Sequence, residues 1–422
     1  MTPASDIARI LQGWGGRPSV AVVNLDQLAA NVGVLRGLIG DGTRLMSIVK
    51  ADGYGHGAIP VAKTAIASGA NELGVATVEE GARLRAAGIA APILVMGPIG
   101  ERERRRAIAS DLMLVVGDTH FAKDLAADVR ASGRKDPLPV HLKIDTGMNR
   151  FGIAPDAAVE VARAVDRLPE LRLDAVMTHL ACADDPASAA TDQQVDVFDR
   201  AVAAIRAAGI DVPSQHIANS PGTINFPHLH RDRVRVGTAM YGLRPDPAMG
   251  LPAPLRPVMT VHSRISRIHA LQPGDRVSYG GTWTAEAPTR AGLVAIGYGD
   301  GYDRSGSNRA WMEVRGQQAP VLGRVCMDQT VIGVPDDART GDLVTVIGDG
   351  QDGVAPGVDE LAAMYGTISY DLACGLVAPR LAHLYVKDGH LVAITDLWGY
   401  RELDEGALDV PATAGEAHAE AR

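Results

Sequence analysis

Short apolar runs alternate with amphipathic helical patterns through the first part of the chain. An apolar run at residues 20–23 precedes a helical pattern that puts Leu28, Val32, Leu35 and Leu38 on one face. The pair Thr77 and Glu80 has the spacing of a capping box and predicts a helix start. Strand-like runs lie at residues 45–49, 73–76, 93–96, 112–116, 140–144, 175–178, 215–218 and 234–236.

This alternation of eight strand patterns with helical patterns predicts a (β/α)8 barrel. A doubly wound open sheet shows the same alternation, and counting strands does not exclude it. In a barrel, the residues that follow the strands gather at one mouth, where active sites form.

The rhythm changes near Pro257. Alternation from Val258 to Ser266 predicts short strands, and turn signals recur at residues 273–275, 316–317, 340–342 and 387–389. We therefore predict a barrel domain at residues 17–255, a mostly β-strand domain at residues 256–400, and a mobile tail at residues 401–422.

Composition narrows the classes of partner. The net charge of −9 has acidic and basic residues interspersed, which argues against nucleic acid or an anionic membrane as a main partner. Apolar runs are too short for a membrane span, and residues 1–16 lack the pattern of a secretory signal. Three widely spaced cysteines argue against a disulfide framework or a zinc site. We expect a soluble cytoplasmic protein without a metal.

Lys50 is the most informative residue. It follows the apolar run at residues 45–48 and opens the segment KADGYGHG at residues 50–57. A lysine at the end of a buried strand is costly to desolvate unless it has a chemical role. The glycines allow a close approach of backbone or ligand. Such a lysine can form a Schiff base with a carbonyl cofactor, although a lysine stem packed on the barrel rim is the commoner arrangement.

Further polar residues lie at the ends of predicted strands. Lys143 has apolar neighbours and precedes the segment DTGMNRFG at residues 145–152, and His179 follows another strand. Ser220, Gly237 and Thr238 suit a phosphate, because they offer a hydroxyl group and backbone N–H groups. Each position also has an ordinary structural explanation, such as an outward lysine or a histidine hydrogen-bonded in the core.

Together these segments resemble the alanine racemases, over residues 19–400 and in the family's order. The resemblance implies pyridoxal 5'-phosphate (PLP) as cofactor, interconversion of L- and D-alanine (EC 5.1.1.1) that supplies D-alanine for peptidoglycan, and a homodimer whose subunits share each active site. The motifs lie at residues 49–57, 139–152, 177–181, 216–220, 235–242, 276–282, 325–328 and 368–370.

The resemblance also implies residue roles. Racemisation needs an acid or base on each face of a planar carbanion. Lys50 takes the D side, and Tyr279 of the partner subunit takes the L side. Arg150 and Met327 bind substrate, and Asp328 supports them. Lys143 is expected to be carbamylated, which converts a cation into an anion that can pair with Arg150. The cofactor-binding residues are Lys50, Tyr54, Arg150, His179, Ser220, Arg235, Gly237, Thr238 and Tyr370.

Arg235 carries a sharper expectation. By resemblance it faces the pyridine nitrogen, and an arginine does not give up its proton. The ring nitrogen therefore stays unprotonated and PLP becomes a weaker electron sink, which limits transamination.

The family's entrance channel corresponds here to Asp184, Tyr298, Arg304, Arg324 and Ile368. The sequence departs from the family's usual pattern at three places. These are Pro221 and Gly222 after Ser220, Asp303 before Arg304, and residues 379–382 (PRLA). They leave the entrance shape and the breadth of substrates open.

Alternative functions are a broad-specificity or serine racemase, a non-catalytic PLP-binding protein and a fold-related decarboxylase. Tyr279, Met327 and Asp328 argue against the binding protein, which would lack the second domain. Arg235 argues against the decarboxylase, where an acidic residue is expected. The absence of a signal pattern and of a membrane span argues against the broad-specificity and serine racemases.

Overall fold

Eight parallel strands close into a barrel in the computed structural model, which describes residues 4–246, 249–252, 254–350 and 353–403. The first and last barrel strands pair in parallel, with Arg44 opposite Arg233. The closed barrel confirms the predicted fold and excludes the open sheet. Its strands are β2 (Arg44–Ile48), β3 (Glu72–Val75), β4 (Ile93–Val95), β5 (Met113–Val116), β6 (Leu138–Lys143), β7 (Leu171–Met177), β8 (Gln215–His216) and β9 (Arg233–Val236).

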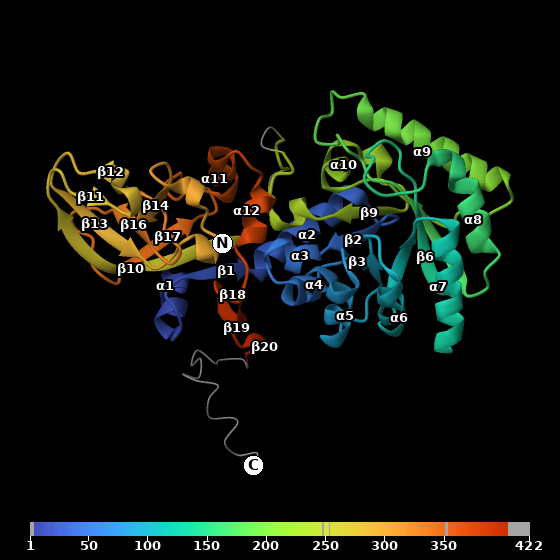
Figure 1. Ribbon diagram of the computed structural model, residues 1–422, viewed down its shortest axis with the longest axis horizontal. Helices are drawn as coiled ribbons and strands as arrows, with labels where there is room; N and C mark the ends of the chain where they lie inside the picture. Colours follow the sequence, from blue (N-terminus) through green and yellow to red (C-terminus); the bar gives the residue numbers. More distant parts are fainter. Residues whose placement is uncertain (1–3, 247–248, 253, 351–352, 404–422) are drawn as a thin grey trace, which may run out of the picture.

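Helices wrap the outside of the barrel (Figure 1). The capping box predicted at Thr77 and Glu80 is present at the start of α5. On α2, Leu28, Val32 and Leu35 are buried as expected, but Leu38 is 42% exposed and Ile39 is buried instead. The helices of this part are α2 (Leu25–Ile39), α3 (Lys50–Tyr54), α4 (Ala58–Ala67), α5 (Val78–Ala86), α6 (Glu101–Ala109), α7 (Thr119–Ser132), α8 (Ala158–Asp166), α9 (Ala190–Ala207) and α10 (Ser220–Asn225), with the 3-10 helices η1 (Pro155–Ala157), η2 (Pro227–Leu229) and η3 (Thr238–Tyr241).

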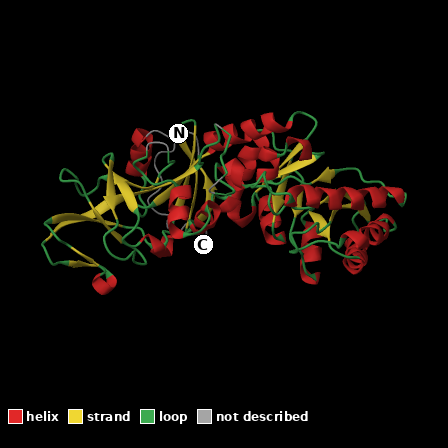
Figure 2. Cartoon of the chain, turned by 90° about the horizontal axis from the view of Figure 1, so that it is seen from above, coloured by secondary structure: helices red, strands yellow, loops and turns green. Residues whose placement is uncertain are grey.

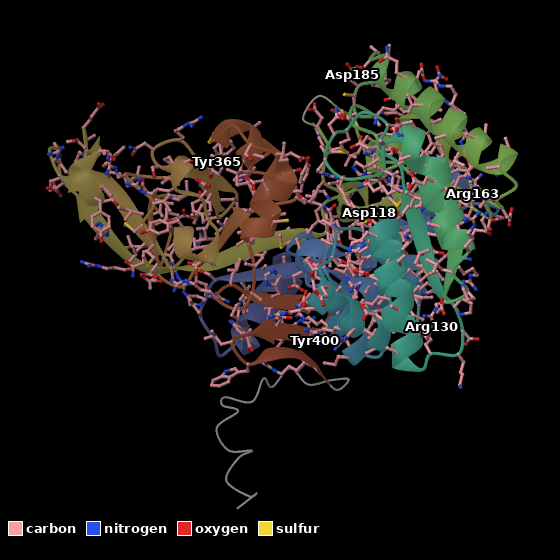
Figure 3. All side chains as sticks on the ribbon, turned by 45° about the vertical axis from the view of Figure 1, so that its right-hand side comes forward. Asp118, Arg130, Arg163, Asp185, Tyr365 and Tyr400 are labelled. Carbon is pink, nitrogen blue, oxygen red and sulfur yellow. The ribbon has the colours of Figure 1, made fainter. Side chains whose placement is uncertain are left out.

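Polar contacts fix α7 against the barrel. Asp118 caps its start by accepting a hydrogen bond from the backbone N–H of Phe121, and Arg130 near its end donates to Glu170 at 2.8 Å (Figure 3). Because Glu170 directly precedes β7, this contact joins the helix to the base of a barrel strand.

The second half is mostly β-strand, as predicted, and lies beside the barrel (Figures 1 and 2). The alternation from Val258 predicted short strands, but it belongs to a single long strand, β10 (Met259–Leu271). The other elements are β11 (Arg276–Val277), η4 (Tyr279–Gly281), β12 (Trp283–Thr284), β13 (Thr289–Val294), η5 (Tyr298–Asp300), η6 (Arg304–Gly306), β14 (Trp311–Val314), β15 (Gln317–Pro320), β16 (Thr330–Gly333), β17 (Leu343–Ile347), α11 (Val358–Tyr365), α12 (Ser369–Gly375), β18 (Ala382–Lys387), β19 (His390–Asp396) and β20 (Gly399–Glu402).

The N-terminal segment belongs to the large sheet of this second half. After α1 (Ala4–Gly13), strand β1 (Val20–Asn24) lies between β10, which is antiparallel to it, and β18, which is parallel. Segments near the two ends of the described chain therefore meet in one sheet, next to α2 of the barrel.

The domain limits at residues 17, 255 and 400 stay predictions. Strand β20 extends to Glu402, and residues 404–422 of the predicted tail lie outside the described residues. None of the helices in the described ranges is long and apolar enough to cross a membrane.

Candidate active site

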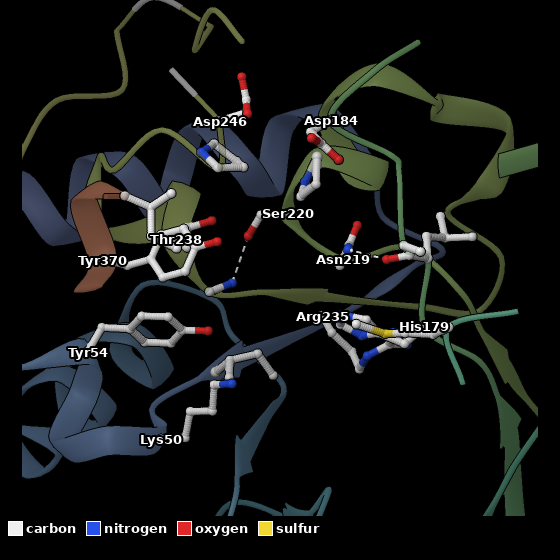
Figure 4. A pocket seen from close by; sticks show the side chains of 18 of the residues that line it. Lys50, Tyr54, His179, Asp184, Asn219, Ser220, Arg235, Thr238, Asp246 and Tyr370 are labelled. Atoms are coloured by element: carbon white, nitrogen blue, oxygen red, sulfur yellow. Dashed lines mark hydrogen bonds between the residues drawn. The ribbon is translucent and has the colours of Figure 1, made fainter. Parts of the chain in front are cut away.

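A cavity of about 420 Å³ opens at the carboxyl ends of the barrel strands (Figure 4). Asp184 and Ile368, expected in an entrance channel, lie in its wall. The structure thus collects in one place side chains that are far apart in the sequence. All the predicted cofactor-binding residues line it: Lys50, Tyr54, Arg150, His179, Ser220, Arg235, Gly237, Thr238 and Tyr370.

Lys50 is held by an unusual backbone turn. Directly after it, Ala51, Asp52 and Tyr54 all have left-handed φ angles, of 51°, 51° and 53°. Such angles are unfavourable for residues with a Cβ and persist where surrounding contacts enforce them. Here the carboxylate of Asp52 accepts hydrogen bonds from Ala58 N–H and Arg83, both at 2.9 Å. Glu80 accepts one from Ala51 N–H at 2.7 Å, so the cap of α5 also fixes the lysine turn.

The environment of Lys50 favours a neutral amine. Burial is the main cause that lowers the pKa of Lys50, and the positive charge of Arg150 lowers it further. A neutral amine is the nucleophilic and proton-accepting form of lysine. Its Nζ lies 5.7 Å from the centre of the Tyr54 ring.

At two positions after Lys50, the structure requires glycine for a reason that the sequence did not reveal. A Cβ on Gly55 would lie 2.0 Å from the carbonyl oxygen of Ala373 in α12. A Cβ on Gly57 would lie 2.0 Å from the hydroxyl of Tyr385 in β18. The segment needs glycine because the second half of the chain packs directly against the lysine turn.

Arg235 is buried on β9 with its terminal nitrogens fully engaged. Nη1 donates to Nδ1 and to the carbonyl oxygen of His216, each at 3.1 Å. Nη2 donates to the carbonyl oxygens of Thr178 at 2.7 Å and Ile217 at 3.1 Å. Within the described part of the chain, the remaining Nε–H has no protein acceptor, although the residue lines the cavity. Arg235 can therefore donate one further hydrogen bond to a ligand.

His179 lies beside this guanidinium, with its Nδ1 3.3 Å from Arg235 Nη2. Burial is the main cause that lowers the pKa of His179 well below its usual value, and Arg235 and Arg150 add to the effect. The imidazole is therefore neutral and packs as an uncharged ring against the cavity.

Lys143 ends β6 and is not among the residues that line the cavity; its Nζ lies 5.0 Å from the centre of the Phe151 ring. Burial, followed by the charges of Arg235 and Arg150, lowers the pKa of Lys143 to about 8. The loop that carries Arg150 is shaped by Asp145, whose carboxylate accepts the backbone N–H groups of Gly147 and Asn149 at 3.0 Å. A lysine that is partly neutral can react to form a negatively charged group, and the two nearby arginines would stabilise that charge.

The side opposite Lys50 can receive an anion. Ser220 Oγ accepts the Gly237 N–H at 2.9 Å, which brings the start of α10 next to the end of β9. A Cβ on Gly237 would lie 2.7 Å from the Tyr54 hydroxyl, so glycine permits this approach. Burial raises the pKa of both Tyr54 and Tyr370, which keeps their hydroxyl groups protonated as hydrogen-bond donors.

Tyr279, Met327 and Asp328 are not brought to this cavity. They line a separate hollow of about 460 Å³ in the second half of the chain. Tyr279 is 72% exposed and Met327 is 52% exposed, while Asp328 pairs with Arg380. The predicted channel residues Tyr298, Arg304 and Arg324 do not line the barrel cavity either. On a single chain, the residues predicted for one active site are thus divided between the barrel and the second half.

Sequence reasoning did not single out Asn219 or Met96, which also line the cavity. Asn219 caps α10 by accepting the Gly222 N–H at 3.0 Å, and its amide donates to the carbonyl oxygen of Leu180 at 3.2 Å. An asparagine directly before Ser-Pro is a helix-start signal that could have found it. The described residues contain no cluster of side chains suited to hold a metal ion.

Comparisons with protein-family models divide the chain into the same two parts, the barrel and the mostly β-strand second half. Residues 23–245 match the family model described as alanine racemase, N-terminal domain, and residues 258–385 match alanine racemase, C-terminal domain. Among curated relatives, alanine racemase of Symbiobacterium thermophilum is 41% identical over 88% of this chain and 98% of its own length. Alanine racemase of a Nostoc species is 40% identical over 86% of this chain and 94% of its own length.

Solved structures show the same likeness. Alanine racemase from the D-cycloserine producer Streptomyces lavendulae superposes with a TM-score of 0.83 at 35% identity, covering 88% of this chain and 98% of that one. Alanine racemase from Bacillus anthracis, solved with bound L-Ala-P, gives a TM-score of 0.84 at 32% identity, covering 90% and 97%.

Proposed function

This chain belongs to the alanine racemase family of enzymes, and from that premise we propose that it interconverts L-alanine and D-alanine with PLP in the barrel cavity. The observation that carries the proposal is the meeting of Lys50 and Arg235 in one cavity, the first with a lowered pKa and the second with a free Nε–H.

The donor set suits PLP. Lys50 offers an amine for the aldehyde, and Arg235 offers one N–H for the pyridine nitrogen. Ser220, Gly237, Thr238, Tyr54 and Tyr370 offer hydroxyl and backbone N–H donors for the phosphate, while His179 offers a neutral ring beside the pyridine. When bound, PLP supplies the electron withdrawal that makes the Cα proton of the amino acid acidic. Because Arg235 cannot lose its proton, it limits this withdrawal and with it transamination.

Two bases are assigned to the two faces of the substrate. Lys50 accepts and returns the Cα proton on the D side, for which a neutral amine is needed. Tyr279 does the same on the L side. Its exposure, away from Lys50 of its own chain, supports a homodimer in which Tyr279 and Met327 complete the cavity of the partner protomer.

Arg150 and the backbone N–H of Met327 are assigned to the substrate, with Asp328 in support. Lys143 is assigned as a carbamate that pairs with Arg150. The pKa of about 8 supports this, because the neutral amine is the form that reacts with CO2. The ion pair would orient the guanidinium of Arg150 toward the cofactor.

We also assign the enzyme to the cytoplasm, where D-alanine would supply peptidoglycan precursors. Three unpaired cysteines are consistent with a reducing compartment. A small site bounded by tyrosines favours alanine over bulkier amino acids. The alternative is a broad-specificity or serine racemase, because the unusual residues at the entrance leave the breadth of substrates open.

The decisive experiment incubates the purified protein with PLP and single L-amino acids, and measures the D-isomer. Lys50→Ala serves as the blank. Fast conversion of alanine alone would establish the activity and its specificity together. Equal turnover of serine, lysine or arginine would instead identify a broad-specificity racemase. A PLP absorbance band that depends on Lys50, without turnover of any amino acid, would identify a non-catalytic binding protein.

A further inference from the structure

A line of buried polar side chains crosses the barrel below the cavity. His216 Nδ1 lies 3.1 Å from Arg235 Nη1, and His216 Nε2 lies 3.0 Å from His141 Nδ1. His141 Nε2 in turn lies 3.4 Å from Asp174 Oδ2. Strands β9, β8, β6 and β7 each contribute one of the four residues. The carboxylate end is 21% exposed and lines a second cavity, where the barrel strands begin.

The chemistry of the two ends fixes every proton in this line. Arginine only donates hydrogen bonds, so His216 Nδ1 must accept. A neutral imidazole has one donor and one acceptor, so the proton of His216 is on Nε2 and is donated to His141 Nδ1. The proton of His141 is then on Nε2 and faces the carboxylate of Asp174. All the hydrogen bonds run in one direction, from the guanidinium to the carboxylate.

Both histidines have reason to stay neutral. Burial lowers the pKa of His216 well below its usual value, and the charge of Arg235 adds to this. Burial also lowers the pKa of His141, although Asp174 opposes the shift.

Arg233 does not interrupt the line. Its Nη1 lies 3.5 Å from His141 Nε2, but both atoms carry hydrogen in this arrangement. Its guanidinium is held instead by Asp174 at 2.6 Å and by Glu72 at 3.3 Å.

We infer that Asp174 and His141, acting through His216, are positioning residues that orient Arg235 so that its Nε–H points into the cavity. This inference rests on the proposed function, in which that Nε–H meets the pyridine nitrogen. Neither Asp174 nor His141 lines the cofactor cavity. If His141 no longer accepts, His216 can place its proton on Nδ1, against an N–H of Arg235. The repulsion would then move the guanidinium.

The test reads histidine protons directly. Protein labelled with ¹⁵N-histidine is examined by NMR with and without PLP, and His141→Phe and His216→Phe assign the two signals. We expect both residues in the Nε2–H form in the parent protein. In His141→Phe we expect loss of the fixed Nε2–H form of His216, a shifted absorbance band of bound PLP, and kcat for alanine lowered about tenfold, the scale on which outer partners of a site act. The KM for alanine should change much less.

Two further variants separate positioning from folding. Asp174→Asn keeps an acceptor oxygen for His141, whereas Asp174→Ala removes it, so Asn should preserve the His141 signal and the absorbance band better than Ala. His262→Asn is the matched control, because His262 is buried in β10, outside the line. It should leave both readouts unchanged.

The tautomers can be read without cofactor, so this inference can fail independently of the racemase activity. An Nδ1–H form of His216 in the parent, or an unchanged His216 signal and PLP band in folded His141→Phe, would overturn it.

Discussion

Gly55 lies so close to Ala373 that a Cβ on it would stand 2.0 Å from the carbonyl oxygen. The contact joins the lysine turn of the barrel to helix α12 of the second half. The position of Lys50 therefore depends on both halves of the chain.

Gly55→Ala should lower the free energy of unfolding by several kcal/mol, since it adds a backbone clash to an unfavourable left-handed φ of 79°. Gly133→Ala is the matched control, because Gly133 at the end of α7 has a similar left-handed conformation, with φ of 73° and ψ of 11°, and nothing lies within 4 Å of the added Cβ. It should cost only about 1–2 kcal/mol. Urea unfolding of both variants measures the difference. Equal losses would show that the contact with Ala373 relaxes freely.

Lys143 should take up CO2 with a characteristic pH dependence. Its pKa is lowered to about 8, so the neutral amine that reacts with CO2 grows as the pH rises through that value. At a fixed concentration of dissolved ¹³CO2, the carbamate signal in ¹³C NMR should therefore rise most steeply near pH 8. Lys143→Met should lack the signal, and the exposed Lys123 provides a control through Lys123→Met, which should keep it. A signal that survives in Lys143→Met would place the carbamate elsewhere.

Tyr279→Phe should slow conversion of L-alanine to D-alanine by about 10²-fold or more, the usual contribution of a positioned acid or base. PLP should stay bound, because Tyr279 lies outside the barrel cavity. Separate assays of each direction, with the PLP absorbance as a binding control, measure the effect. Unimpaired L-to-D turnover would remove Tyr279 from the mechanism.

Mixing two inactive variants should restore activity if each site is shared between subunits. A heterodimer of Lys50→Ala and Tyr279→Phe protomers has one site with both residues intact and one with neither. Random reassociation should restore about a quarter of the parental L-to-D activity, because half of the dimers carry one good site each. Mixtures left without exchange of subunits are the control. If exchange restores nothing, the two residues act within a single chain.

Arg235→Glu should change the outcome of the reaction and not only its rate. A carboxylate can share a proton with the pyridine nitrogen, which strengthens electron withdrawal by PLP. Racemisation should fall, and pyruvate should form from alanine by transamination. Arg235→Lys keeps the positive charge and should form much less pyruvate. Identical pyruvate yields from the two variants would argue against contact with the ring nitrogen.

Local sequence patterns predicted most of the fold and several residues of the cofactor cavity. The eight barrel strands overlap the apolar runs that predicted them, because periodicity reports which face of an element is buried. The bounds differ most for β7, which begins at Leu171 and not at residue 175, and for β10, which is one long strand where short strands were predicted. Several cavity residues, such as Lys50, His179 and Gly237, follow strands that end at one mouth. Tyr370 lies instead in α12 of the second half and was identified by resemblance.

The sequence by itself thus determined the approximate positions of the strands and helices, because these depend on the spacing of apolar residues between near neighbours. Its resemblance to the alanine racemases singled out the lysine segment. The structure decided that the strands close into a barrel, since an open sheet shows the same alternation. Only the tertiary structure decided which distant segments meet. It placed β1 between β10 and β18, set Gly55 against Ala373, and aligned His141 with His216 across two strands. It also separated Tyr279 from Lys50. The physical reason is that a hydrophobic pattern records that a residue is buried, but not which partner buries it.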